Sequence, residues 1–67
     1  MTQFQSGDRV KLNELGRLRI IDGRTNKTTK VTTGKVVRPS RYKRSVIIRR
    51  DGYHTDEVFS IVFWERE

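Results

Sequence analysis

The sequence predicts an all-β domain, a small barrel of about five short antiparallel strands with one long polar loop. Three observations support this prediction. Short β-branched runs such as Val46-Ile47-Ile48 are bounded by turn residues, as strands are. The glycines stand singly where turns are expected, and no segment has the length and apolar spacing of a convincing helix. The chain has 67 residues, which suits one domain, residues 1–67, built from short elements.

Composition limits how such a domain is stabilised. A chain of this size buries only about 60% of the surface that it exposes when unfolded. It has no cysteine and one histidine, His54, so disulfides are excluded and neither a metal site nor a cofactor is expected. Stability must then come from tight barrel closure or from a partner chain, and we expect a monomer or weak homo-oligomer.

The chain shows no export signal and no membrane segment. Its longest apolar run, residues 58–64, is interrupted by Ser60 and is far shorter than the roughly 20 residues of a membrane span. The absence of cysteine also suits a reducing compartment. We therefore expect a cytoplasmic protein.

The first half of the chain predicts one strand and two loops. Residues 7–12 indicate a turn and a strand with Val10 and Leu12 on one face. Residues 13–21 are interpreted as a loop with apolar anchors, because the glycines leave too few residues for a helix. Residues 22–33 are polar and rich in threonine, which favours a flexible loop or a ragged hairpin.

The second half predicts a meander of strands. Pro39 ends the first of them, because proline cannot donate to a central ladder. Asp51-Gly52 is typical of a two-residue hairpin turn. The expected elements are strands at 34–38, 45–50, 53–57 and 63–65, a hairpin connection at 40–44, and a tight turn or short helix at 59–62. Phe59, Phe63 and Trp64 are expected to close the barrel.

The order of these elements resembles the SH3-like barrels of the KOW type, and in particular small barrels from bacteria and their phages. The matching segments are Gly-Asp-Arg-Val at 7–10, Thr-Gly-Lys-Val-Val at 33–37, Val-Ile-Ile-Arg-Arg-Asp-Gly at 46–52 and the terminal Phe63-Trp64-Glu65. The resemblance spans nearly the whole chain and implies an SH3-like barrel. It implies no function, because this fold serves many tasks.

Positive charge is concentrated in one part of the chain. Residues 23–50 contain ten Lys and Arg and no Asp or Glu, within a chain of net charge +7. Residues 51–67 contain one Arg and five acids. Like charges gathered in this way repel each other unless an anion offsets them. Such a cluster of basic residues is typical of a nucleic-acid-binding protein.

The hairpin between residues 35 and 50 is the expected interface with DNA or RNA. Its cations would hold phosphates, and Tyr42 and Tyr53 would stack on bases. No recognition helix is visible, so binding without sequence specificity is expected. The candidate nucleic-acid-binding residues are Lys35, Arg38, Arg41, Tyr42, Lys43, Arg44, Arg49, Arg50 and Tyr53.

Other interpretations of the charge remain open. The basic hairpin could dock an acidic protein partner, and residues 51–67 could pair with the basic segment of a second copy. The acidic segment could also fold across the basic patch and mask it. Lys27 and Lys30, in the threonine-rich segment, could add phosphate contacts.

The sequence does not predict an enzyme, and no catalytic residue is assigned. Asp56 and Glu57 are adjacent, so on a strand they would point to opposite faces and could not act as a pair. Plasmid-type dihydrofolate reductases resemble this chain in their opening Gly-Asp-Arg-Val element. Their Val-Gln-Ile-Tyr strand motif is missing, because residues 46–49 are Val-Ile-Ile-Arg.

Overall fold

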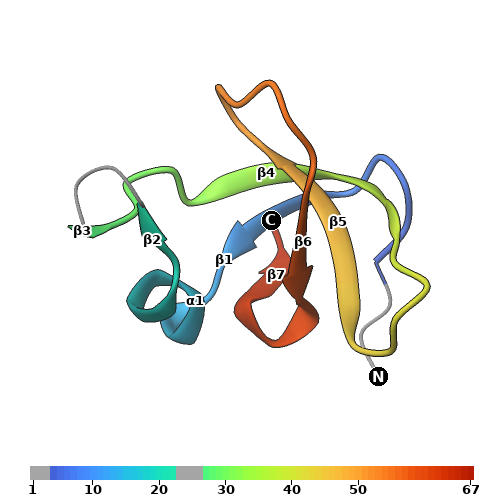
Figure 1. The fold of residues 1–67 in the computed structure, drawn as a ribbon, viewed down its shortest axis with the longest axis horizontal. Helices are drawn as coiled ribbons and strands as arrows, with labels where there is room; N and C mark the ends of the chain where they lie inside the picture. The colour runs from blue at the N-terminus through green and yellow to red at the C-terminus, as the bar shows by residue number, and fades with distance from the viewer. Residues whose placement is uncertain (1–3, 23–26) are drawn as a thin grey trace.

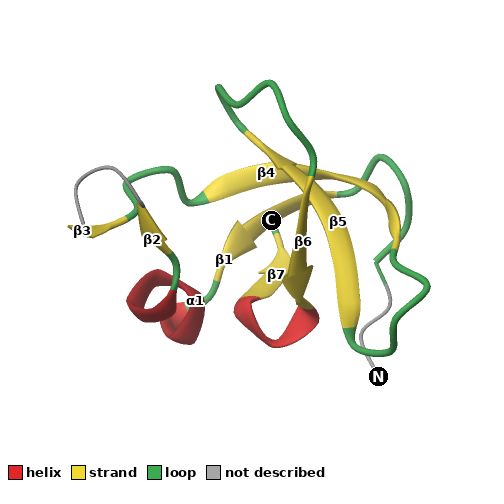
Figure 2. Cartoon of the chain, viewed as in Figure 1, coloured by secondary structure: helices red, strands yellow, loops and turns green. Residues whose placement is uncertain are grey.

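The computed structural model describes residues 4–22 and 27–67. The described residues form the elements β1 (Arg9–Leu12), α1 (Glu14–Arg19), β2 (Ile21–Asp22), β3 (Lys27–Thr28), β4 (Thr33–Pro39), β5 (Ser45–Arg50), β6 (Glu57–Ser60), the 3₁₀-helix η1 (Ile61–Phe63) and β7 (Trp64–Arg66). Figures 1 and 2 show that strands dominate the fold. Five of them form an antiparallel sheet in the order β6-β5-β4-β1-β7, and β2 pairs with β3. The predicted all-β class is confirmed.

The five-stranded sheet curls into a barrel-like shape, because η1 joins its two outer strands. In a flat sheet, β6 and β7 would be about 19 Å apart, since neighbouring strands lie about 4.8 Å from each other. A three-residue 3₁₀-helix rises only about 6 Å. Figure 1 shows η1 as a tight coil that carries the chain from β6 directly into β7. The tight turn or short helix predicted at 59–62 is therefore this 3₁₀-helix, which begins two residues later and ends one residue later than expected.

The concave side of the sheet holds the apolar core. Val10 and Leu12 of β1 are buried while their neighbours on the strand are exposed, as their alternation predicted. Ile48 on β5 is opposite Val36 on β4 and is fully buried. Trp64 is 3% exposed and packs edge-on against Phe59, with the ring centroids 5.2 Å apart. Phe4, Val46 and the partly buried Ile20, Ile61 and Phe63 complete this cluster.

Helix α1 corrects the prediction of a loop at residues 13–21. Asn13 caps it, and its side-chain oxygen accepts a hydrogen bond from the Gly16 amide at 2.8 Å. Gly16 was interpreted as a helix breaker but lies inside the helix. A Cβ on Gly16 would come 2.3 Å from the Phe63 carbonyl oxygen, so glycine is needed where α1 crosses η1. Packing against the rest of the fold thus stabilises a helix that is too short to be seen in the sequence.

The connection between β5 and β6 is longer than the predicted two-residue hairpin. Asp51 and Gly52 do form a turn, and the Tyr53 amide donates to the Arg50 carbonyl at 3.0 Å. However, β6 begins only at Glu57, which is opposite Ile48. The strand predicted at 53–57 is therefore wrong, and residues 51–56 form a loop.

The threonine-rich segment contains a short hairpin within its described part. Ile21 is opposite Thr28, and Asp22 is opposite Lys27. Thr29 is 7% exposed, so the segment is anchored there. Part of the flexible loop predicted at about 22–33 falls on residues 23–26, which lie outside the described residues.

Candidate nucleic-acid interface

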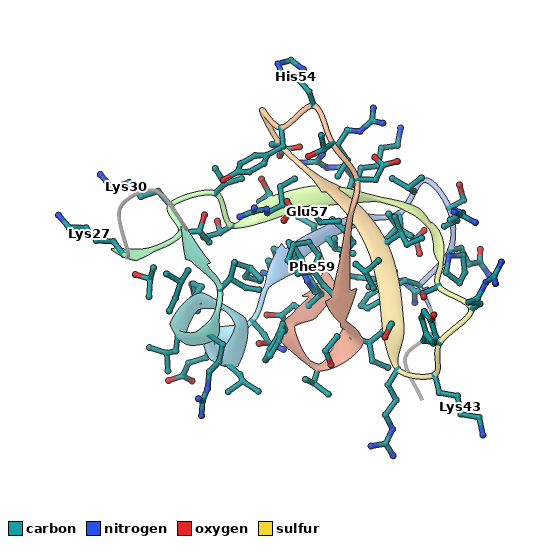
Figure 3. The ribbon with its side chains drawn as sticks, viewed as in Figure 1. Lys27, Lys30, Lys43, His54, Glu57 and Phe59 are labelled. Atoms are coloured by element: carbon teal, nitrogen blue, oxygen red, sulfur yellow. The ribbon has the colours of Figure 1, made fainter. Side chains whose placement is uncertain are left out.

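The predicted site residues are divided between the two ends of the β4–β5 hairpin. Residues 40–44, the tip loop, connect the strands at one end. Lys35, Arg49 and Arg50 lie toward the other end, next to the loop at 51–56. Figure 3 shows Lys43 of the tip loop and His54 of the 51–56 loop on opposite sides of the molecule. The hairpin therefore does not gather all of its cations on one surface, which corrects the expectation from the sequence.

A bulge in β4 determines which way Arg38 faces. The register advances from Val36↔Ile48 to Arg38↔Ile47, so Val37 is the extra residue. Directly opposed residues share a face of the sheet, and the pair Lys35↔Arg49 lies on the exposed outer face. Without the bulge, Arg38 would be opposite a core residue. With it, Arg38 shares the outer face with Lys35.

Three cations stand in a row across the outer face, one on each of three neighbouring strands. Arg9 of β1 is opposite Lys35 of β4, and Lys35 is opposite Arg49 of β5. Like charges in directly opposed positions destabilise a sheet. The acids of residues 51–67 offset this repulsion.

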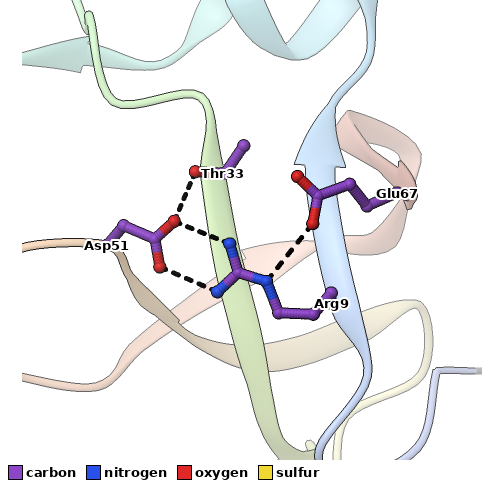
Figure 4. Close-up of polar contacts among 4 residues, drawn as sticks. All are labelled: Arg9, Thr33, Asp51 and Glu67. Carbon is purple, nitrogen blue, oxygen red and sulfur yellow. Dashed lines mark hydrogen bonds and ion pairs between the residues drawn. The ribbon is translucent and has the colours of Figure 1, made fainter.

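Arg9 is paired on both sides by acids (Figure 4). Its guanidinium donates two hydrogen bonds to the Asp51 carboxylate, at 2.9 and 2.8 Å, and its Nε donates to Glu67 at 3.2 Å. The Thr33 hydroxyl also donates to Asp51. The Arg9 and Thr33 hydrogen bonds lower the pKa of Asp51 from 3.8 to about 2, and those from Asp51 and Glu67 raise the pKa of Arg9.

Arg49 is paired as well, with its Nε donating to Asp56 at 2.8 Å. In the part of the chain that the structure describes, Lys35 is the member of this row without an ion pair. The acidic segment therefore neutralises the basic hairpin, but at the end that adjoins the 51–56 loop. The sequence left open whether the acidic segment covers the basic patch. Within residues 4–22 and 27–67, it does so only at this end of the hairpin.

Arg50 is not placed for phosphate binding. It is 6% exposed, and its Nε and Nη2 donate to the Glu57 carboxylate at 3.0 and 2.8 Å. Its guanidinium carbon lies 3.9 Å from the Tyr53 ring centroid, so Tyr53 is half-buried beneath a protein cation. We exclude both residues from the interface.

The tip loop differs from the opposite end in its electrostatics. Arg38, Arg41, Lys43 and Arg44, the tip cations, are all exposed. Among the described residues they make no ion pair and no side-chain hydrogen bond. Tyr42 stands between them and is 69% exposed. Lys27 and Lys30 lie on the far side of the molecule from Lys43 in Figure 3, so they do not extend this surface.

The backbone of the tip loop is held in place from two sides. The Tyr42 amide donates to the Ser40 hydroxyl at 3.2 Å, and the Arg44 carbonyl accepts from the Ile61 amide at 2.9 Å. Arg44 has a φ of 61°, in the left-handed region that residues other than glycine seldom occupy. Such a conformation in a residue other than glycine is typical of functional sites.

A groove of about 720 Å³ lies beside the tip loop. It is lined by Phe4, Gln5, Pro39, Ser40, Tyr42, Lys43, Arg44, Ser45, Val46 and Ile61. Phe4 and Ile61 were not predicted as site residues. They come from distant parts of the chain, and no local pattern in the sequence links them to the tip loop.

The described residues do not bring three or more His, Asp or Glu together as a metal site would require. None of their helices has the length and apolar character needed to cross a bilayer. No family model matches the chain, and no significant match is found among curated proteins or solved structures.

Proposed function

We propose that this chain is a non-enzymatic nucleic-acid-binding module, a small barrel of the SH3-like KOW type that contacts phosphates through its tip cations. One observation carries the proposal. The acids of residues 51–67 pair with Arg9 of β1 and with Arg49 and Arg50 at the other end of the hairpin, whereas the tip cations have no acidic partner among the described residues. Exposed, unpaired cations are where a polyanion gains most from binding, because no internal ion pair has to be broken first.

The bulge and the tip loop together support a phosphate-binding role. The bulge turns Arg38 outward, and the other three tip cations lie within four consecutive residues of one loop. Contacts of this kind position a nucleic acid without reading its bases. Binding largely without sequence specificity follows, with a dissociation constant of about 10⁻⁴ to 10⁻⁶ M at physiological salt.

The salt dependence of binding should report how many phosphates are contacted. If each of the four tip cations neutralises one phosphate, log K falls with log salt with a slope of about −2.8 for a single strand and about −3.6 for a duplex. Removing two tip cations should reduce the magnitude of the single-strand slope by about 1.4.

A pair of matched double variants tests the proposal. R41Q/K43Q removes two tip cations, and R17Q/R19Q removes two exposed cations from α1, so both lower the net charge equally. We expect R41Q/K43Q to weaken binding of a fluorescent 12-mer at least tenfold at 50 mM salt. R17Q/R19Q should change it less than threefold.

Equal weakening by both variants would show that only net charge matters and would overturn the tip as the interface. No binding of the wild type at 50 mM salt would overturn the function. An acidic peptide of the same charge serves as a competitor. If it displaces the 12-mer at equal concentration, an acidic protein becomes the better candidate partner.

A further inference from the structure

The groove beside the tip loop has an apolar interior and a basic rim. Phe4 and Val46 are 5% and 1% exposed and form its floor, with Ile61 partly buried beside them. Pro39 and Tyr42 supply further apolar surface at its edge. Its volume of about 720 Å³ lies within the range typical of small-ligand sites, about 300–1,000 Å³.

Two of the tip cations, Lys43 and Arg44, line the same groove. Polyanion contacts and an apolar cavity therefore share one surface. Phosphates alone would not need the cavity, and an apolar peptide would not need the cations. A nucleotide with an unpaired base needs both, because its flat apolar base is attached to a charged phosphate.

From this juxtaposition, and resting on the proposed function, we infer that the groove takes an unpaired base of a single-stranded nucleic acid. The base would stack against the exposed Tyr42 ring while Lys43 and Arg44 hold the flanking phosphates. Bases in a duplex are paired and stacked inside the helix, so they cannot enter the groove without being flipped out. The protein should consequently prefer single strands to duplexes.

Fluorescence anisotropy with three labelled probes of equal length tests this inference. The probes are a dT 12-mer, a 12-mer with abasic sites throughout, and a 12-base-pair duplex. Stacking of one base corresponds to a gain of about 5- to 150-fold in affinity. We expect the dT strand to bind more tightly than the abasic strand by a factor in this range, and more tightly than the duplex.

The variant Y42A should remove this preference without affecting the phosphate contacts. Its affinity for the dT strand should fall to that of the abasic strand, while its affinity for the abasic strand stays within about twofold of the wild type. Y42F should retain the preference. Tyr42 is 69% exposed, so neither change should disturb the fold, which thermal melting would verify.

The results separate the groove from the tip cations. If the wild type binds all three probes equally well, or if Y42A keeps the preference for the dT strand, the groove does not take a base. The phosphate-binding function would stand in both cases. If none of the probes binds at 50 mM salt, both proposals fail.

Discussion

The guanidinium of Arg50 lies over the ring of Tyr53, with its central carbon 3.9 Å from the ring centroid. From the sequence, Arg50 was predicted to contact phosphates and Tyr53 to stack on bases. In the fold they contact each other, and the Arg50 guanidinium also donates two hydrogen bonds to Glu57. Both residues therefore stabilise the barrel.

This arrangement predicts that two arginines of the same hairpin contribute very differently to stability. R50A should lower the free energy of unfolding by about 2 kcal/mol, because it leaves the Glu57 carboxylate and Thr29 without their donor. R41A should change it by less than about 0.5 kcal/mol, since Arg41 is an exposed loop residue. Urea titration followed by the fluorescence of the buried Trp64 measures both. An R50A variant as stable as the wild type but weaker in nucleic-acid binding would return Arg50 to the interface.

Arg44 should show a trade-off between stability and binding. Its φ of 61° is unfavourable for any residue with a Cβ atom, and glycine has none. R44G should therefore raise the free energy of unfolding by about 0.5–1 kcal/mol. The Arg44 carbonyl still accepts from the Ile61 amide in this variant, because only the side chain is removed. Affinity for a 12-mer should fall severalfold in the same variant.

The matched control for this prediction is R44A. It removes the same charge but keeps a Cβ, so it should lose affinity as R44G does without gaining stability. If R44A were the more stable of the two by urea titration, the left-handed backbone at residue 44 would not be a source of strain.

The Asp51 ion pair predicts a pH dependence of stability. The pKa of Asp51 is lowered from 3.8 to about 2 in the folded state, chiefly by the Arg9 hydrogen bonds. The folded protein thus binds this proton less readily than the unfolded chain, so the contribution is complete above about pH 4 and is lost as the pH falls toward 2. The urea midpoint of D51N should lie below that of the wild type at pH 6 and approach it near pH 2.

The urea midpoint of R9Q should likewise lie below that of the wild type at pH 6 and approach it near pH 2, because R9Q leaves Asp51 without its guanidinium partner. The pair is about half exposed, so the effect should shrink in high salt. A difference between D51N and the wild type that stayed constant from pH 6 to pH 2 would contradict this assignment.

The sequence was informative where a local pattern determines structure. The alternation around Val10 and Leu12 predicted a strand with one buried face, and the run at 45–50 predicted β5. The sequence was misleading where contacts between distant segments determine the local structure. Gly16 sits inside α1 because it must pass the Phe63 carbonyl, and that contact is invisible in the local sequence.

The candidate site was predictable only in part for the same reason. The tip loop could be recognised in the sequence because three of its residues 41–44 are basic. A one-residue bulge decides that Arg38 faces outward, and acids that lie 7 to 58 residues from their partners decide that Arg9 and Arg49 are paired. Counting charges along the chain could not reveal which cations remain unpaired.

Amide chemical shifts followed during titration with a dT 12-mer would locate the nucleic-acid interface residue by residue. We expect the largest shifts on residues 38 and 40–44, with smaller ones at Phe4 and Ile61 along the groove. Amides of the row at Arg9, Lys35 and Arg49 should change little. Shifts concentrated on that row or on Lys27 and Lys30, with the tip loop unaffected, would contradict the proposed interface.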